Sequence, residues 1–439
     1  MAMEDTADRI VEKAISLGCQ DAIADVVTNR SYQIRFARNE AVISNRWREN
    51  TASVFFVYQK RVLASDIKDL SRADEAVERL VKIAKGSQEN PDYAGIGKGP
   101  FRYAKTRPDP KVLSLEEGGR YVEAAVGGAV DEGAKECAGS FWKYEDEHFL
   151  STSNGAEGRD HRASLYLSIR ALVSLESSGH GIAAATKLSQ FDPARAGHKA
   201  GRIATLAKTP KRGKAGKYMV VFDPLIFGSL TDQVGGRLGA WVVMAGLSPF
   251  GKKIGKRVAS TELTLYDDGS ADSIARKRYD AEGVPTRKNV LVNKGILKTY
   301  LHNTSTAKKF KTKTTGNAGL ISPDPHAIFV KPGDWSRDEI FSEVKDGLWL
   351  TNTWYTRYQS YVTGDLSTIP RDGIFHIRNG EVAEAWKDIR VTDNIIRMMK
   401  NIVGLTDTTE QMMWWGEVSV PNFVPYALIK DVGITTSAE

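Results

Sequence analysis

The hydrophobic pattern of the first 86 residues predicts a compact mixture of helices and strands. Residues 6–17 carry apolar side chains at helical spacing. Residues 32–36 alternate between apolar and polar side chains, which is typical of a half-buried strand. Residues 52–64 predict a hairpin that turns near Gln59 and Lys60. This part of the chain is therefore expected to form a small α+β unit.

A helix is expected to close that unit, and a connector to follow it. Ser71 to Asp74 resembles a capping box, and Gly86 is a suitable end for the helix. Residues 87–112 are rich in proline and glycine, which indicates a connecting segment. The GIGKGP stretch within it lacks a following helix, so we interpret it as a turn and not as a phosphate-binding loop.

The central and C-terminal parts differ in the balance of helix and strand. In residues 113–206 the patterns predict helices at both ends, over 113–137 and 189–205, with strands at 149–153, 164–175 and 182–188. Residues 208–217 are a basic linker. Residues 218–439 are richer in strands and turns, with strands or hairpins at 289–301, 348–358 and 373–382 and helices at 224–240, 303–310, 336–346 and 391–403.

These patterns predict an α+β protein of several segments, with an N-terminal α+β domain and a strand-rich C-terminal domain. The expected boundaries are an N-terminal subdomain, a connector, a central subdomain and a C-terminal domain, at 1–86, 87–112, 113–206 and 218–439. Such a division suits a chain of 439 residues, which exceeds the usual size of one core.

Composition narrows the class of protein. The chain has no apolar run near the roughly 20 residues that span a bilayer, and its acidic N-terminus is unlike a secretory signal. Both observations favour the cytoplasm. Cys19 and Cys137 are far apart, which excludes a cysteine zinc cluster or a disulfide framework. The net charge of +7 arises from 61 basic and 54 acidic residues, so nucleic-acid binding is not favoured.

Candidate catalytic groups are sparse. The seven histidines are never closer than 13 residues, so no pair can bind zinc from one helical face. His161 and His180 remain candidates only for a site assembled from distant segments. No G-x-S-x-G motif occurs, which removes the usual sequence signal for a serine hydrolase. From the residues alone, no catalytic constellation is visible.

One helix nevertheless resembles a catalytic helix. The stretch GSLTDQVGGR, residues 228–237, follows the strand-like run 218–222, and Asp223-Pro224 makes a suitable start for a helix. Asp232 and Arg237 lie five residues apart on it. They also allow a simple interpretation, namely an ion pair on a surface or between helices.

A family resemblance gives this helix a meaning. Several blocks of the C-terminal segment, in this order and spacing, resemble the TldD/PmbA (TldE) family, historically called modulators of DNA gyrase: YDDG (266–269), YDAEGVPTRKNVLVNKGILKTYLHNTSTAKKF (279–310), TGNAG (315–319), DGLWLT (346–351), TGDLS (363–367) and IRNGEV (377–382). The resemblance implies cytoplasmic proteins that act in peptide proteolysis. It also implies two subunit types: a TldD type, with zinc held by an H-E-x-x-x-H helix and a later Cys, and a TldE/PmbA type without these ligands.

Placed on the family motif, the three key positions are degenerate. The first His falls at Asp232, the Glu at Gln233 and the second His at Arg237. Asp232 could supply one oxygen, but a glutamine cannot act as general base and an arginine repels a metal ion. No Cys follows Cys137, and residues 199–301 contain no His. We therefore expect no catalytic residue and no metal in this chain.

The resemblance thus predicts a TldE/PmbA-like, non-catalytic subunit of a TldD/TldE-type zinc metallopeptidase. The expected partner is a TldD-like catalytic subunit, which would carry the zinc, or a second copy of the chain in a homodimer. The substrates would be peptides or unfolded proteins, without a membrane or nucleic acid. Two rivals remain: a peptidase with an unorthodox metal site of its own, and a homodimeric binding protein without enzymatic activity.

Overall fold

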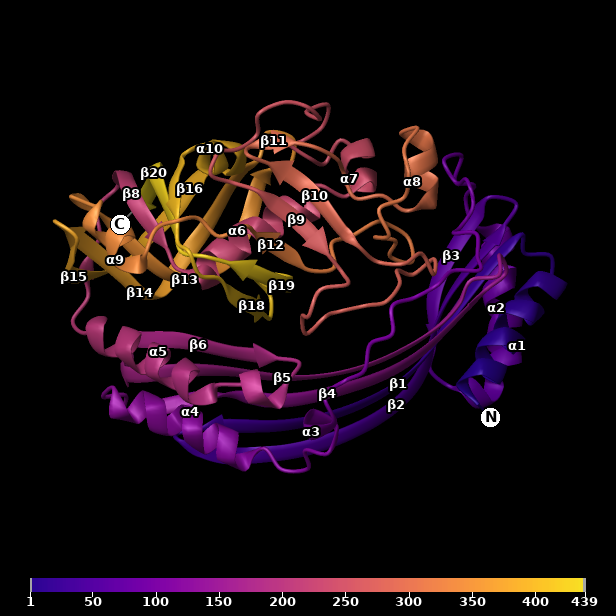
Figure 1. Ribbon diagram of the computed structural model, residues 1–439, viewed down its shortest axis with the longest axis horizontal. Helices are drawn as coiled ribbons and strands as arrows, with labels where there is room; N and C mark the ends of the chain where they lie inside the picture. Colours follow the sequence, from indigo (N-terminus) through magenta and orange to yellow (C-terminus); the bar gives the residue numbers. More distant parts are fainter. Residues whose placement is uncertain (1, 437–439) are drawn as a thin grey trace.

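The computed structural model describes residues 2–436 of the chain. In this part, the strands form three sheets, one from the N-terminal half and two from the C-terminal half. Figure 1 shows the first sheet as a long curved layer, with the C-terminal sheets lying over its concave side. None of the helices of residues 2–436 combines the length and the apolar character needed to cross a membrane. The expected α+β class and the strand-rich C-terminal region are confirmed.

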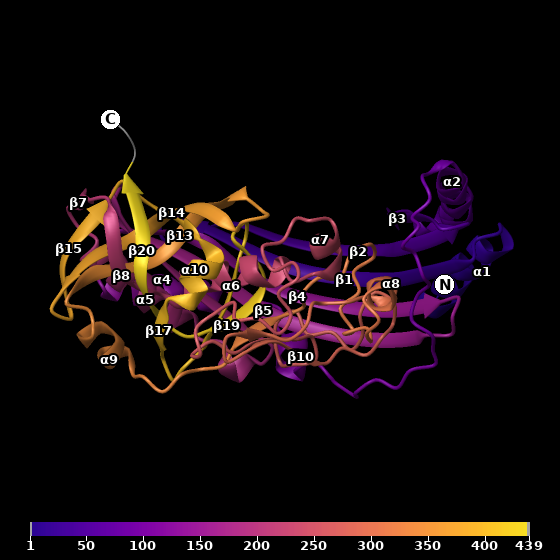
Figure 2. The ribbon, with the colours of Figure 1, turned by 90° about the horizontal axis from the view of Figure 1, so that it is seen from above.

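The long sheet is antiparallel and has the strand order β3-β2-β1-β4-β5-β6. Its strands are β1 (Asp21–Ala37), β2 (Glu40–Tyr58), β3 (Arg61–Ile67), β4 (Glu136–Thr152), β5 (Glu157–Ser174) and β6 (Ser177–Ala185). Gln59 and Lys60 form the expected turn, and both have positive φ, at 47° and 61°. Figure 2 shows the longest strands running along most of the molecule. One sheet therefore unites the segments 1–86 and 113–206, and the boundary near 206–218 stays a prediction.

Alternating side chains give this sheet two different faces. Ile34 and Phe36 of β1 point to the face that the helices cover, whereas Gln33 and Arg35 point to the concave face. The covering helices lie near the two ends of the sheet: α1 (Met3–Ser16) and α2 (Ala73–Gly86) at one end, α4 (Gly119–Asp131) and α5 (Pro193–Leu206) at the other. The short helix α3 (Pro110–Leu113) and the 3-10 turns η1 (Leu70–Arg72) and η2 (Leu188–Gln190) fill the connections.

Two expectations about these helices are wrong. The expected capping box from Ser71 to Asp74 does not form, because α2 begins without a side-chain cap. Instead, Asp69 caps the 3-10 turn η1 before it, and its side chain accepts a hydrogen bond from the Ser71 amide. The predicted helix 113–137 is shorter, because α4 ends at Asp131 and Glu136 already begins β4. Residues 136–148 pair with β5, residues 139–148 also pair with β1, and such non-local pairing overrides local propensity.

The C-terminal half is built from two further sheets. The six-stranded sheet has the order β11-β10-β9-β12-β19-β18, from β9 (Leu265–Asp268), β10 (Lys288–Asn293), β11 (Ile296–Leu297), β12 (Ile328–Val330), β18 (Glu410–Trp414) and β19 (Val418–Val424). The eight-stranded sheet comprises β7 (Lys211–Arg212), β8 (Gly216–Phe222), β13 (Asp346–Ser360), β14 (Asp365–Arg378), β15 (Glu381–Lys387), β16 (Ile389–Asn394), β17 (Ile402–Leu405) and β20 (Ala427–Thr436). Because β13 pairs with both β8 and β14, the strands β13, β8, β20, β16 and β14 close into a ring.

The main helix of this half is α6 (Pro224–Gly236), which starts where the sequence predicts. Asp223 caps it by accepting a hydrogen bond from the Leu225 amide at 3.4 Å. The predicted helix 224–240 breaks after α6, since Leu238 and Ala240 exchange backbone hydrogen bonds with Leu301. The remaining helices are short: α7 (Ala240–Met244), α8 (Thr304–Lys309), α9 (Arg337–Ser342) and α10 (Ile395–Lys400). The first residues of the predicted helix 391–403 belong to β16 instead.

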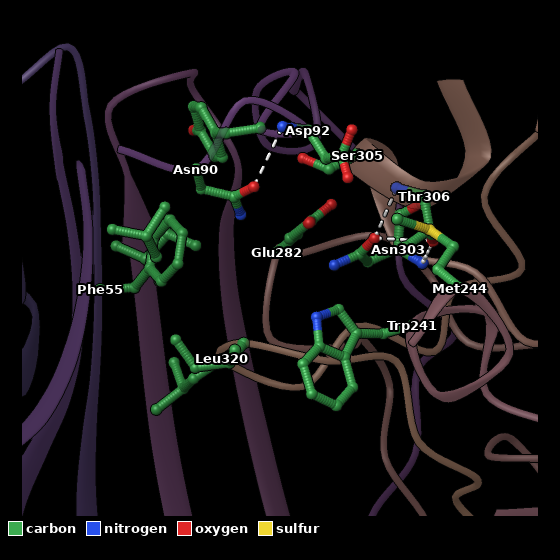
Figure 3. Close-up of a pocket in the computed structure, with 14 residues that line it drawn as sticks. Phe55, Asn90, Asp92, Trp241, Met244, Glu282, Asn303, Ser305, Thr306 and Leu320 are labelled. Carbon is green, nitrogen blue, oxygen red and sulfur yellow. Dashed lines mark hydrogen bonds between the residues drawn. The ribbon is translucent and has the colours of Figure 1, made fainter. Parts of the chain in front are cut away.

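The connector joins the long sheet to the C-terminal half around a small cavity. Figure 3 shows Glu282 between Asn90 of the connector and Asn303, the cap of α8. The Tyr93 hydroxyl donates to Asp21 at 2.6 Å and fixes the connector to β1. The cavity has a volume of about 80 Å³, enough for a few water molecules and too small for a peptide. We therefore regard it as a structural joint.

Two buried carboxylates of the DAEGVPT segment organise this joint. Asp280 accepts backbone hydrogen bonds from Glu282, Val284 and Ala318, each at 2.9 Å. Glu282 accepts from the Thr304 amide at 3.2 Å and from the Thr304 hydroxyl. Burial raises the pKa of Asp280 to about 7, and burial with the nearby Asp280 raises the pKa of Glu282 to about 8.

The packing of α4 against α5 predicts that alanine at two glycine positions affects stability very differently. A Cβ added to Gly197 of α5 would lie 1.9 Å from the carbonyl oxygen of Ala125 in α4, whereas a Cβ on Gly127 would meet nothing within 4 Å. Gly197→Ala should lower the free energy of unfolding in urea by about 1–3 kcal/mol, because the helices must separate. Gly127→Ala, the matched control, should leave it unchanged or raise it by up to about 1 kcal/mol. Equal effects of the two changes would contradict this packing.

The raised pKa of Glu282 predicts a pH-dependent stability. A protonated Glu282 is favoured in the folded state up to about pH 8, but in the unfolded chain it ionises near its ordinary pKa of 4.5. Its contribution to stability is therefore complete below pH 4.5 and is lost as the pH rises through 8. Between pH 7 and 9 the free energy of unfolding should fall by about 1 kcal/mol more in the wild type than in Glu282→Gln.

Denaturation at several pH values measures this difference, with Glu40→Gln at an exposed position as the control. The control should keep the wild-type dependence on pH. Parallel curves for the wild type and Glu282→Gln would show that the joint does not hold a protonated Glu282.

Candidate functional site

A large cavity lies between the concave face of the long sheet and the hairpin formed by β18 and β19. We call it the sheet cavity, and its volume is about 1140 Å³. Figure 1 shows β18 and β19 above the middle of the sheet. The side chains that define the cavity come from both sides: Gln33, Arg35, Val42, Ile43, Trp142, Tyr144, Tyr166 and Ser168 from the sheet, and Met413, Trp414, Trp415, Val418 and Ser419 from the hairpin. This volume exceeds that of most small-molecule pockets and suits a peptide segment.

Aromatic rings form much of the wall on the sheet side. Trp142 stacks on Trp47 with ring centroids 5.7 Å apart and on Tyr144 at 5.2 Å. These rings share one face of the sheet, since Gln33 lies opposite Trp142 and Trp142 lies opposite Tyr166. Such a surface provides apolar contact area without much loss of side-chain freedom. It can accept aliphatic or aromatic side chains of an extended peptide.

A chain of hydrogen bonds runs behind this wall. The Asn352 side-chain amide donates to Asp372 Oδ2 at 2.6 Å and faces His180 Nδ1 at 3.1 Å. His180 Nε2 lies 2.8 Å from Ser168 Oγ. Because Asn352 donates to Nδ1, the proton of the neutral imidazole lies on Nε2 and is donated to Ser168. Burial lowers the pKa of His180 to about 4, so the ring is neutral at pH 7.

This direction of donation decides what Ser168 can do. A general base would have to accept the serine proton on Nε2, but His180 presents an N–H to that oxygen. The arrangement of Ser168, His180 and Asn352 therefore resembles a catalytic triad in its residues and not in its proton positions. It acts as a structural support for β5, β6 and β13, and it fixes the hydroxyl that lines the cavity.

Asp232 of α6 lies behind the hairpin and not in the sheet cavity. It is 8% exposed, and its Oδ1 accepts hydrogen bonds from the Val420 amide at 3.2 Å and the Asn422 side chain at 3.3 Å. Burial raises its pKa, against these hydrogen bonds and those of Ser419. The carboxyl thus fastens β19 to α6.

Gln233 and Arg237 are also held in structural contacts. The backbone carbonyl of Gln233 accepts a hydrogen bond from the Tyr358 hydroxyl at 3.5 Å. The Arg237 guanidinium carbon lies 4.5 Å from the ring centre of Tyr361 and 5.2 Å from that of Tyr358. Within residues 2–436 no ion pair joins Asp232 to Arg237, so their contacts are with other elements.

Zinc, which the family motif implies, does not fit these three positions. Asp232 Oδ1 is occupied by two donors, Gln233 offers no anionic ligand, and a permanent cation stands at Arg237. Among the described residues, one group of three potential ligands lies close together elsewhere, namely Glu145, Glu147 and His161. Arg30 pairs with both glutamates, at 3.2 and 2.6 Å, and already neutralises much of their charge.

A half-buried lysine, whose side chain is 21% exposed, connects the parts that form the site. Lys199 of α5 lies 2.8 Å from Asp223, the cap of α6, and 3.1 Å from Glu410 of β18. Burial lowers the pKa of Lys199, but the two carboxylates raise it well above its ordinary value, so the ammonium stays charged. This contact sets α6 and the hairpin against the helical layer of the long sheet.

Sequence reasoning located the helix but not the cavity. Asp232, Gln233 and Arg237 lie on or directly after α6, where they were predicted, yet they do not meet at an open site. His180 lies in β6. The aromatic wall was missed, although alternate aromatic residues at Trp142 and Tyr144 were a signal for a strand with one aromatic face.

Comparisons with known proteins agree with this architecture. A family profile described as the PmbA/TldA metallopeptidase C-terminal domain matches residues 215–436. A metalloprotease of Methanocaldococcus jannaschii is 33% identical over 203 residues, which are 44% of this chain and 44% of that protein. A metalloprotease of Methanothermobacter thermautotrophicus is 30% identical over 218 residues, 48% of this chain and 46% of that protein. The match thus spans less than half the length of either relative.

Solved structures extend the likeness to the whole fold. TldE from Thermococcus kodakarensis superposes with a TM-score of 0.85 at 18% identity, over 98% of this chain and 100% of that chain. A protein of Thermotoga maritima assigned as a modulator of a DNA gyrase gives a TM-score of 0.83 at 19% identity, over 99% of this chain and 100% of that chain. At such identities the likeness concerns the fold alone. Because the family profile covers half of the chain, the protein belongs to the PmbA/TldD metallopeptidase family.

Proposed function

We propose that this chain is the non-catalytic, TldE/PmbA-like subunit of a TldD/TldE-type zinc metallopeptidase complex. It completes the peptide-processing chamber of a TldD-like partner in the cytoplasm, and that partner supplies the zinc. The observation that carries the proposal is the state of α6. Asp232 is buried in hydrogen bonds to β19, and the Arg237 guanidinium packs against two tyrosine rings.

The sheet cavity supports a role in holding the peptide. Strand β2 borders it, and within the described residues its outer edge is paired with β3 only from Ala52 onwards. Residues 40–50 are exposed, and Val42 and Ile43 line the cavity. An extended peptide can add to such an edge through backbone hydrogen bonds, while its side chains contact the aromatic wall. The main-chain contacts would make binding tolerant of peptide sequence.

The rival functions have weaker support. A metal site of its own would need His161 or His180, but both ring nitrogens of His180 face hydrogen-bonding partners, and His161 lies beside Glu145 at 3.2 Å. A homodimeric binding protein would need no partner of the TldD type. Such a protein could use the same sheet cavity and β2 edge, but it would not form an active complex with a TldD-like partner.

Zinc content and peptide cleavage test this proposal. The purified chain should contain no stoichiometric zinc and should not cleave an unfolded peptide, because the α6 positions lack two ligands and the base. Addition of a TldD-like partner should give a zinc-containing complex that cleaves. Metal analysis and a peptide cleavage assay measure both quantities.

The matched control is a partner whose H-E-x-x-x-H glutamate is changed to glutamine. That complex should assemble, bind zinc and lose cleavage by several orders of magnitude, since the general base is absent. Zinc at one equivalent together with cleavage by this chain alone would contradict the proposal. Full activity of the partner without this chain would contradict the role in the chamber.

A second prediction separates a structural His180 from a metal ligand. His180→Ala should lower the free energy of unfolding by about 1–3 kcal/mol, because Ser168 and Asn352 lose a buried partner. The folded variant should keep the zinc content and the cleavage of the complex. His161→Ala, at a side chain 37% exposed, should change stability by about 1 kcal/mol or less. Loss of zinc or of all cleavage in a folded His180→Ala complex would favour the unorthodox site.

A further inference from the structure

A second cleft adjoins the sheet cavity and differs from it in charge. We call it the basic cleft; its volume is about 710 Å³. Four segments distant in sequence meet there: the end of the connector, β5, the β6–α5 connection and the loop after β9. The cleft borders the sheet cavity, since Ile274 lines both spaces.

Cations outnumber carboxylates in this cleft. It is lined by Arg107, Lys111, Arg162, Lys187 and Arg276, against two aspartates. Both aspartates, Asp109 and Asp272, accept hydrogen bonds from other groups of the protein. The surplus of positive charge therefore faces the open space, where it can attract an anionic group.

The two aspartates satisfy local groups. Asp109 accepts hydrogen bonds from the backbone amides of Lys111 at 3.0 Å and Leu188 at 2.9 Å. Asp272 accepts from Lys187 Nζ at 2.8 Å and from the Thr186 hydroxyl. These contacts fix the loop after β9 to the end of β6, and they leave the two arginines nearest the interior without carboxylate oxygens at hydrogen-bond distance.

Donors deep in the cleft lack acceptors. Within residues 2–436, Arg276 Nε and Arg162 Nε are buried without a hydrogen-bond partner, and so is the hydroxyl of Ser273, a residue 1% exposed. Arg162 is partly committed, because its Nε lies 3.9 Å from Asp160 Oδ2 and its terminal nitrogen contacts His148. Buried donors without partners cost free energy, and an anionic ligand would remove that cost.

We propose that the basic cleft binds a carboxylate of the peptide that the sheet cavity holds. This inference rests on the proposed function, because it needs a peptide in the sheet cavity. Guanidinium groups present parallel N–H donors that match the two oxygens of a carboxylate, and a serine hydroxyl adds a third donor. The carboxylate is either the C-terminus or an acidic side chain, since both present the same group. The cleft would thus set the register of the peptide by anchoring one end.

Calorimetry on the full chain tests this with three eight-residue peptides of the same apolar sequence. One has a free C-terminal carboxylate, one a C-terminal amide, and one an amide with glutamate at the last position. The free acid should bind about tenfold more tightly than the amide, a difference of about 1.4 kcal/mol in the free energy of binding. The glutamate peptide tells the sources apart: affinity like the acid shows that any carboxylate suffices, and affinity like the amide shows recognition of the C-terminus.

Variants assign the effect to the cleft. Arg276→Gln and Ser273→Ala should each reduce the preference for the acid, the former to about one, because its charge is lost. Arg79→Gln, at an exposed position of α2, is the control and should keep the full preference. Unchanged thermal unfolding verifies that the variants fold, and Ser273→Ala provides the test if Arg276→Gln does not.

Equal affinity of acid and amide would overturn the carboxylate site, and so would a preference that survives in both variants. The proposed function would stand in that case, because it is judged by zinc content and cleavage of the complex with its partner. Failure of all three peptides to bind would also overturn the site. Cleavage by the chain alone would instead reject the proposed function, whatever the preference for the acid.

Discussion

The Lys199 ammonium lies between Asp223 and Glu410. It joins the helical layer of the long sheet to the C-terminal half of the molecule. Asp223 caps α6, and Glu410 begins β18, so one half-buried cation contacts both the helix and the hairpin. Removing one partner of such a group would leave a buried charge uncompensated. The contact joins the helical layer of the sheet to the hairpin that bounds the sheet cavity.

The side chains of α6 are engaged in contacts with other elements of the fold. In a metal-binding helix, ligands must remain free of other partners and face an open position. Here Asp232 fastens β19, and the aromatic rings of Tyr358 and Tyr361 hold Arg237. Under the proposed function, this helix positions the chamber wall, and the peptide contacts would fall to the aromatic wall, the β2 edge and the basic cleft.

Local signals predicted what local physics decides. Asp223-Pro224 marked the start of α6, and Gln59-Lys60 marked a turn, because caps and turns depend on neighbouring residues. Residues 40–50 and 136–148 were missed as strands. Residues 40–50 are exposed, and residues 136–148 carry many charged side chains, so in both the order comes from pairing with distant strands. The family resemblance assigned the degenerate positions, but no sequence pattern indicated that four distant segments meet in a basic cleft.

The most direct test of the central claim is the position of zinc in the assembled complex. Anomalous diffraction at the zinc absorption edge, from crystals of the chain with a TldD-like partner and a bound peptide, would give it. We expect the zinc peak on the partner, facing the sheet cavity of this chain, with no peak near Asp232. A peak at α6 of this chain, between Asp232 and Arg237, would contradict this expectation.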